Sequence, residues 1–185
     1  MRISLELRTT PSQLTARFSV PSGGARTDRQ RVEPGAWGAV IRDSAGRSME
    51  LMRWGKGESR LSDDVRLSVD VRIEDLVGRH SRHLLERRLL VPVSSFSVGS
   101  GGEMRRFRSV DGGLLTLAGV WDVDGYWRGR PVRCFRVVTG PGDALARLPL
   151  VLRSENERIW LNPFAADTAL LDALEPLNED SLEIS

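Results

Sequence analysis

The chain has 185 residues, of which 40% are hydrophobic and 28% charged, and this composition is typical of a folded domain rather than of a disordered or membrane-spanning chain. No apolar run approaches the roughly 18 residues that span a bilayer, and the first residues lack the apolar core of a signal peptide. A single cysteine excludes an internal disulfide. We therefore expect a cytoplasmic protein with no metal site and no cofactor.

The positive charge is almost entirely arginine, because Lys56 is the only lysine. No basic residue follows Arg158, whereas six carboxylates do, so the rest of the chain carries 27 basic residues against 19 acidic ones. A basic body with an acidic tail is typical of a protein that binds a phosphate backbone, since the planar guanidinium group matches phosphate oxygens. The alternative is that arginine simply replaces lysine on solvated faces.

The N-terminal region predicts a short strand and a helix. Leu5–Leu7 fits a strand, and Thr10 is a good N-cap that Gln13 completes as a capping box. Leu14 and Phe18 are four residues apart, so they share the buried face of that helix.

The middle of the chain predicts a hairpin and a second helix. Trp37–Arg42 and Met49–Trp54 flank a turn at residues 43–46. Ile73–Arg87 has helical spacing of apolar residues. Histidines and arginines give this helix a basic face, which fits either a nucleic-acid contact or a solvated surface: His80, His83, Arg79, Arg82, Arg87 and Arg88.

Strand patterns dominate from Leu89 onward. The predicted strands are Leu89–Val93, Met104–Arg108, Leu114–Trp121, Val132–Thr139, Leu148–Leu152 and Arg158–Leu161. A terminal helix then begins at Asn162-Pro163 and runs to about Leu174. The order predicts a single α+β domain with a mostly antiparallel, curled sheet or small barrel and about three helices.

Several segments, in this order, carry a resemblance to a known family. They are Met1–Ser4 with Thr9–Leu14, Met52–Gly55, Val71–Glu74, Arg87–Pro92, Leu117–Trp121, Arg147–Leu152 and Trp160–Pro163. They resemble the Met-Cys-Gly-Arg opening, Arg-Trp-Gly-Leu, Asn-Ala-Arg-x-Glu-Thr, Arg-Arg-Cys-Leu-Ile-Pro, Phe-Ala-Gly-Leu-Trp, Arg-Met-Pro-Val-Ile-Leu and Trp-Leu-Asp-Pro segments of the SRAP family, the SOS response-associated peptidase or abasic-site-processing proteins.

The resemblance implies a compact α+β domain over residues 1–163, with residues 164–185 as a C-terminal helix and acidic tail of the same domain. It also implies a basic groove that holds single-stranded or junction DNA. In the family, an N-terminal cysteine bonds covalently to the aldehyde of an abasic sugar. That chemistry needs the cysteine, an asparagine, a glutamate and a histidine.

None of those four residues stands at the matching position of this chain, where Arg2, Asp70, Val98 and Leu145 are found instead. Arginine is not a nucleophile at neutral pH. A bulky residue at position 2 should also leave Met1 in place. We therefore predict a degenerate member that has lost the family's cross-linking and peptidase chemistry.

Four residues are candidate DNA contacts: Arg2, Trp54, Arg72 and Arg147. Each has a structural alternative. Trp54 fits a core aromatic as well as a base-stacking platform, and Arg72 and Arg147 fit ion pairs with neighbouring carboxylates as well as phosphate contacts. Arg2 fits a phosphate contact, or it fills the old site by pairing with Asp70.

Two functions remain open at this stage. The first is a non-catalytic module that binds single-stranded, abasic or junction DNA in the DNA damage response. The second is a structural role in which a protein partner occupies a closed groove. A weaker third is residual chemistry, in which the Met1 amine forms a Schiff base with an aldehyde.

Overall fold

The computed structural model of the 185-residue chain describes residues 2–21, 30–44, 46–58, 66–76, 86–100, 102–141, 147–174 and 181–185. Its strands are β1 (Arg2–Leu7), β2 (Gln30–Val32), β3 (Trp37–Asp43), β4 (Arg47–Trp54), β5 (Lys56–Glu58), β6 (Arg66–Ser68), β7 (Asp70–Arg72), β8 (Arg88–Val93), β9 (Ser95–Ser100), β10 (Glu103–Ser109), β11 (Leu115–Trp127), β12 (Arg130–Gly140), β13 (Leu148–Pro149), β14 (Val151–Leu152) and β15 (Leu182–Ile184). Its helices are α1 (Pro11–Phe18), α2 (Ile73–Leu76), α4 (Ser154–Leu161) and α5 (Asp167–Ala173).

The larger sheet closes on itself. β12 pairs with β4, β4 with β3, β3 with β8, β8 with β11, and β11 with β12 again. This ring is the small barrel that the sequence predicts, and most of its pairings are antiparallel. The exceptions are the parallel pairs that β12 makes with β4 and β7.

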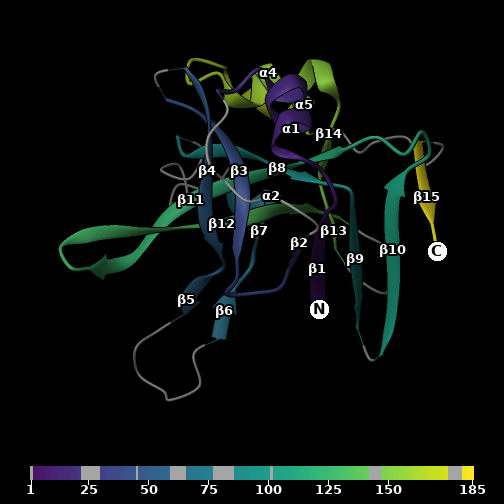
Figure 1. The fold of residues 1–185 in the computed structure, drawn as a ribbon, viewed down its shortest axis with the longest axis horizontal. Helices are drawn as coiled ribbons and strands as arrows, with labels where there is room; N and C mark the ends of the chain where they lie inside the picture. The colour runs from purple at the N-terminus through teal and green to yellow at the C-terminus, as the bar shows by residue number, and fades with distance from the viewer. Residues whose placement is uncertain are drawn as a thin grey trace.

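A second sheet lies beside the barrel, with its five strands in the order β15-β10-β9-β1-β2 (Figure 1). Its side chains alternate as expected for a sheet with one covered face. Ile3, Leu5, Phe96, Val98 and Phe107 are buried in a core that also includes barrel residues. The polar side chains of the same strands therefore form the outer face of this sheet.

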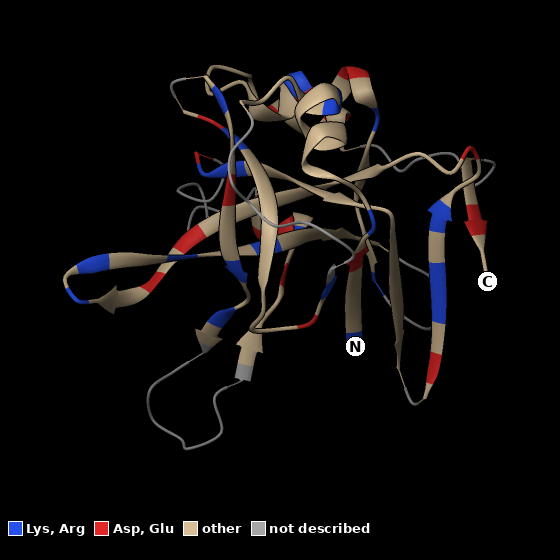
Figure 2. Cartoon of the chain, in the orientation of Figure 1, with Lys and Arg blue, Asp and Glu red and all other residues tan. Residues whose placement is uncertain are grey.

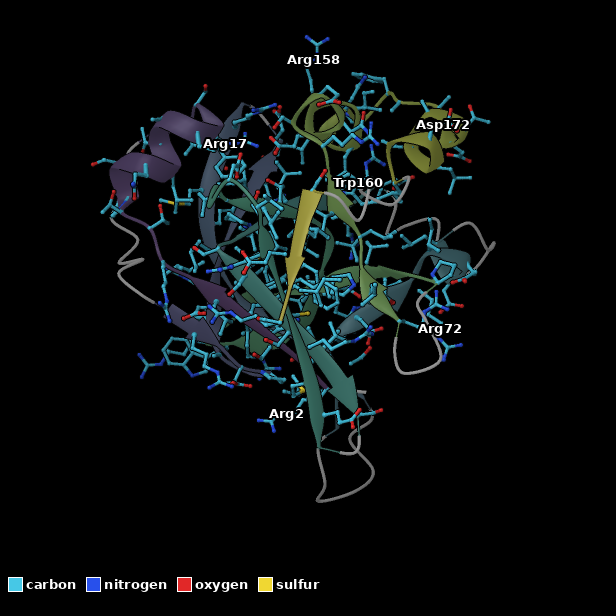
Figure 3. The ribbon with its side chains drawn as sticks, turned by 90° about the vertical axis from the view of Figure 1, so that its right-hand side faces the viewer. Arg2, Arg17, Arg72, Arg158, Trp160 and Asp172 are labelled. Atoms are coloured by element: carbon cyan, nitrogen blue, oxygen red, sulfur yellow. The ribbon has the colours of Figure 1, made fainter. Side chains whose placement is uncertain are left out.

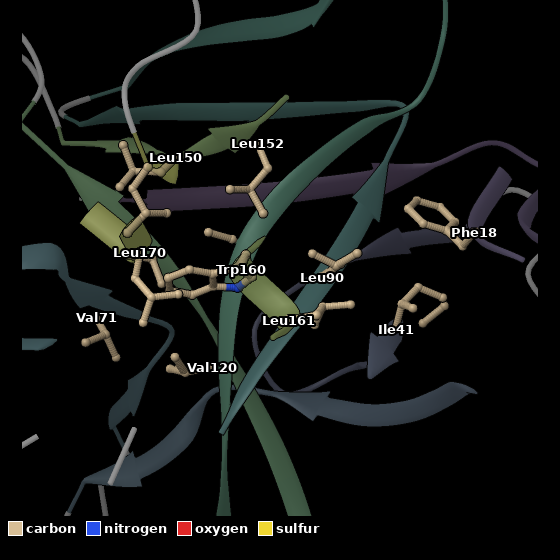
Figure 4. Packing of buried hydrophobic residues seen from close by; sticks show 14 of the residues in the cluster. Phe18, Ile41, Val71, Leu90, Val120, Leu150, Leu152, Trp160, Leu161 and Leu170 are labelled. Carbon is tan, nitrogen blue, oxygen red and sulfur yellow. The ribbon is translucent and has the colours of Figure 1, made fainter. Parts of the chain in front are cut away.

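The helices cover the barrel on another side and share a second core with it (Figure 4). α1 begins at the predicted capping box, in which the Gln13 amide donates to Thr10 Oγ1 at 3.3 Å and the Thr10 amide donates to Gln13 Oε1 at 2.9 Å. Phe18 is fully buried, and so is Trp160 of α4, whose indole N–H donates to the Leu89 carbonyl at 3.0 Å. These contacts fix α1 and α4 on the barrel.

Three sequence predictions need correction or restriction. Arg158–Leu161, predicted as a strand, is the last turn of α4, because Glu157, Trp160 and Leu161 share one buried helical face. The acidic tail, in which the sequence predicts no strand, ends in β15, which pairs with β10 and completes the second sheet. Within the predicted helix Ile73–Arg87, α2 covers Ile73–Leu76, whereas 77–85 fall outside the described residues.

None of the described helices is long and apolar enough to cross a membrane.

Candidate functional site

The start of β1 places Arg2 where the family resemblance puts a nucleophile. Arg2 is exposed and lies opposite Gly99 of β9. Val98, at the position of the family's glutamate, pairs with Ile3 and is fully buried in the core between the sheets. An aliphatic side chain in an apolar core transfers no proton, so Val98 supplies neither an acid nor a base beside the Arg2 cation.

Asp70 and Arg72 come together at a corner formed by β7, α2 and β12. Asp70 lies opposite Val137, and its carboxylate accepts a hydrogen bond from Thr139 Oγ1 at 3.0 Å. Arg72 lies opposite Thr139 and is exposed. Within the described part of the chain, no hydrogen bond or ion pair engages the Arg72 guanidinium group, so its charge faces solvent.

Arg147 reaches the same corner but is held by a carboxylate. Its Nη2 forms an ion pair with Glu74 Oε2 at 2.5 Å and also lies 3.3 Å from the Thr139 carbonyl oxygen. The hydrogen bond from Arg147 holds the pKa of Glu74 below its ordinary value of 4.5. Of the two sequence alternatives for Arg147, the ion pair is therefore the one formed.

The two halves of the predicted site are not joined by an ion pair. Among the residues that the structure describes, none connects Arg2 to Asp70, whose carboxylate is turned to Thr139 instead. Figure 3 shows the Arg2 and Arg72 side chains extending away from the body from different strands. Leu145, at the position of the family's histidine, lies outside the described residues, as do His80, His83, Arg79 and Arg82.

Trp54, which the sequence also offers as a DNA contact, is a core residue. It is fully buried, its indole N–H donates to the Val69 carbonyl at 3.0 Å, and its ring lies parallel to that of Phe135 at 6.3 Å between centroids. This placement leaves no exposed ring face on which a DNA base can stack.

The outer face of the five-stranded sheet carries a polar hollow of about 270 Å³. We call it the sheet-face hollow, and its lining includes Ser4, Glu6, Arg8, Arg31, Ser97 and Arg106. Arg2 shares this face, because alternate residues of a strand point the same way. The arginines of β10 appear as the blue stretches of that strand in Figure 2.

Glu6 organises the centre of the hollow. It accepts hydrogen bonds from Arg8 Nε and Arg106 Nη2, each at 2.5 Å, and from Ser95 Oγ at 3.1 Å. Partial burial raises the pKa of Glu6, but these hydrogen bonds and charges outweigh it and bring the pKa below its ordinary value of 4.5. The carboxylate therefore stays ionised and fixes two guanidinium groups beside the hollow.

An alternation of polar and apolar residues in β1 indicates the polar face that carries this hollow. Arg2, Ser4, Glu6 and Arg8 stand at every second position and alternate with Ile3, Leu5 and Leu7. That pattern predicts a longer strand than Leu5–Leu7, with one polar face. β9 alternates in the same way, as Ser95-Phe96-Ser97-Val98, but the sequence does not show that β1, β9 and β10 are neighbours, because strand order is a property of the tertiary fold.

The only cysteine of the chain is not positioned for chemistry. Cys134 lies fully buried in β12, next to Phe135. Burial raises the pKa of its thiol above the ordinary value of 9.0, and the nearby Asp122 charge raises it further. A protonated, inaccessible thiol is neither a nucleophile nor a metal ligand.

Comparisons with known proteins agree on one family. The chain is 25% identical over 159 residues to the abasic site processing protein YoqW of Bacillus subtilis, covering 78% of this chain and 71% of that protein. It is 23% identical over 160 residues to the abasic site processing protein YoaM of the same organism, covering 78% of this chain and 70% of YoaM.

Two solved structures share the fold. A protein of Bordetella bronchiseptica superimposes with a TM-score of 0.79 at 20% identity, covering 98% of this chain and 97% of that chain. A protein of Bacteroides thetaiotaomicron superimposes with a TM-score of 0.79 at 16% identity, covering 98% and 90%. The family model for SOS response associated peptidase (SRAP) matches residues 2–185, and the chain therefore belongs to the SRAP family.

Proposed function

We propose that this chain is a non-catalytic SRAP protein that binds DNA, single-stranded or at a junction, in the response to DNA damage. Its family and the abasic site processing for which its relatives are named support DNA as the partner. One observation carries the proposal: the exposed Arg2, without a counter-ion in the described part of the chain, stands where the family has its nucleophile.

The residues at the old chemical positions support binding without covalent chemistry. Arg2 supplies a permanent positive charge and no nucleophile. Val98 is buried and aliphatic, and the Asp70 carboxylate is engaged by Thr139. Cys134 is buried, and its raised thiol pKa keeps it protonated. Electrostatic attraction to phosphates needs none of the lost groups.

The proposed contact surface is the sheet-face hollow together with Arg2, and Arg72 at the β7 corner is a second, separate cation. Arg8 and Arg106 are held in place by Glu6, so they present ordered guanidinium groups. Ordered guanidinium groups bind phosphate with a smaller loss of conformational freedom than mobile ones. Trp54 and Arg147 are not part of this surface, because Trp54 is buried and Glu74 neutralises Arg147. Arg8 and Arg106 differ from Arg147 because they share the single charge of Glu6, which leaves the hollow net positive.

The test is fluorescence anisotropy of a labelled single-stranded oligonucleotide and of a labelled single-strand–duplex junction, measured at several salt concentrations. We expect micromolar or tighter binding at low salt that weakens steeply as salt is added. Arg2→Gln and Arg72→Gln should each weaken binding several-fold and reduce the salt slope by roughly 0.7 for each lost single-strand phosphate contact. Arg158→Gln is the control, because it removes the same charge from an exposed residue of α4.

Chemistry is tested separately by borohydride trapping on an oligonucleotide that contains an abasic site. We expect no covalent adduct, and a trapped adduct would show that the chain retains aldehyde chemistry. Absence of binding at low salt would overturn the DNA-binding proposal. A stoichiometric protein that co-purifies from the native host would then favour the structural role instead.

A further inference from the structure

The β11–β12 hairpin extends beyond the barrel, on the side away from β9, β10 and β15 (Figure 1). The pairing shifts between Val123 and Tyr126, and beyond this bulge Trp127 lies opposite Arg130. Bulges re-aim the strands that follow them. The end of the hairpin is therefore a separately oriented feature rather than a simple continuation of the barrel wall.

Two tryptophans line one hollow of about 280 Å³ beside this hairpin, which we call the hairpin cleft. Trp37 of β3 is 51% exposed and Trp127 of β11 is 64% exposed, and Leu51 of β4 lines the same hollow. Large aromatic side chains that remain exposed and converge on one hollow mark an interaction site. Bases of single-stranded nucleic acid stack on such rings whatever their sequence.

The charges around the cleft match a phosphate backbone. Arg130 and Arg133 line it, and the Arg128 guanidinium lies over the Trp127 ring at 4.6 Å from its centroid. Among the described lining residues, Glu50 is the one carboxylate, and Arg42 at 2.8 Å and Arg133 at 3.3 Å neutralise it. The lining is therefore net positive, which favours an anionic partner over a basic or purely apolar one, and the two exposed rings favour unpaired bases as the groups that they contact.

The turn at the hairpin end carries an arginine where the backbone disfavours one. Arg128 has φ 49° and Gly129 has φ 74°, the pair of positive values that a type I′ turn requires. The first of these positions favours Asn, Asp or Gly, because other side chains meet the backbone there. Arg128 thus costs the turn stability while adding a cation next to an exposed ring.

We propose that the hairpin cleft is a second contact region for single-stranded DNA, in which bases stack on Trp127 and Trp37 while Arg128 and Arg130 bind the flanking phosphates. This inference rests on the proposed function, because it assumes that the chain binds DNA. It adds a contact region on the barrel, distinct from the sheet-face hollow on the five-stranded sheet.

The test uses the full chain, oligo-dT as the probe and anisotropy as the readout. Stacking on one aromatic ring is worth roughly 5- to 150-fold in affinity by alanine substitution, so Trp127→Ala and Trp37→Ala should each weaken binding about tenfold or more. Trp127→Phe retains a ring and should keep most of the affinity. Arg128→Asn should weaken binding several-fold while the protein unfolds at the same or a higher temperature, since Asn suits the turn. That combination separates binding from folding.

Arg158→Gln is the matched control and should leave oligo-dT affinity unchanged. If the wild-type chain binds oligo-dT and the cleft variants bind as tightly as this control, the cleft inference is wrong and the proposed function stands. If the wild-type chain does not bind at low salt, both are wrong. If Trp127→Ala abolishes capture of a native-host protein and leaves DNA affinity unchanged, the cleft binds protein and the inference is overturned.

Discussion

Arg147 and Glu74 form an ion pair of 2.5 Å although 73 positions separate them along the chain. The pair closes the corner where Arg72 is exposed, because Arg147 also lies within 3.3 Å of the Thr139 carbonyl oxygen that faces this corner. A carboxylate therefore stands between two arginines, Arg72 and Arg147, and reduces the positive potential of the corner. This arrangement limits what the corner contributes to the proposed DNA binding.

Removing that carboxylate should increase DNA affinity. Glu74→Gln deletes one negative charge and releases Arg147 for phosphate, so we expect about two- to fivefold tighter binding to single-stranded DNA. The salt slope should become steeper by up to roughly 0.7 if Arg147 gains a phosphate contact. Anisotropy titrations at several salt concentrations measure both quantities, with Asp75→Asn as the control for charge alone. Equal gains from the two variants would show that release of Arg147 has no role.

The burial of Trp54 predicts that its substitution affects stability and not affinity. Trp54→Phe removes the donor to the Val69 carbonyl and leaves unfilled space beside Phe135, which should cost about 1–3 kcal/mol in the free energy of unfolding. DNA affinity per folded molecule should stay within twofold of the wild type. Urea unfolding measures the change in the free energy of unfolding, and anisotropy on the same preparation measures DNA affinity. A tenfold loss of affinity without a loss of stability would contradict the core assignment.

The local parts of the fold were predictable because their signals are local. The capping box of α1 and the β3–β4 hairpin depend on residues within a few positions of one another, and both are present. Arg158–Leu161 was wrong as a predicted strand because its run of three apolar residues is too short to distinguish the period of a strand from that of a helix. Glu157 is buried three residues before Trp160, which is the spacing of a helical face. The sequence does not predict this burial, because Glu157 is charged.

The site was less predictable because its partners are distant in sequence. The sequence left Arg147 open between a phosphate contact and an ion pair, because its partner Glu74 lies far from it along the chain. The exposure of Trp37 and Trp127 in one cleft likewise depends on how the β3–β4 and β11–β12 hairpins lie relative to each other. Residue identity indicated which groups carry charge or a ring, while tertiary packing decided which of them remain accessible.

A buried ion pair between α1 and α4 should be a main determinant of stability. Glu157 is 3% exposed in its side chain and accepts hydrogen bonds from Arg17 at 2.6 and 3.1 Å and from Thr116 Oγ1 at 2.7 Å. Breaking a buried pair leaves an uncompensated charge, so Arg17→Ala should cost roughly 3 kcal/mol, or about 6–12 °C in Tm. In a double-mutant cycle with Glu157→Gln, the double variant should lose less than the sum of the single variants. Strict additivity would contradict the coupling.

Acid unfolding should involve Asp122, which holds three strands of the barrel region together. Its carboxylate is bound by Lys56 of β5 and by Arg87, just before β8, at 2.7 Å. Burial raises the pKa of Asp122, but the hydrogen bonds from Lys56 and the Val123 amide, with the charges of Lys56 and Arg87, outweigh it and bring the pKa below its ordinary value of 3.8.

Because the folded-state pKa of Asp122 is the lower one, its contribution to stability is present above about pH 3.8 and is lost as pH falls through the folded-state value. Asp122→Asn should therefore destabilise the protein by about 1–3 kcal/mol at pH 7 and by progressively less below pH 4. Urea unfolding of the two proteins between pH 7 and pH 3 measures this difference. A gap that stays constant down to pH 3 would mean that Asp122 acts through packing and not through its charge.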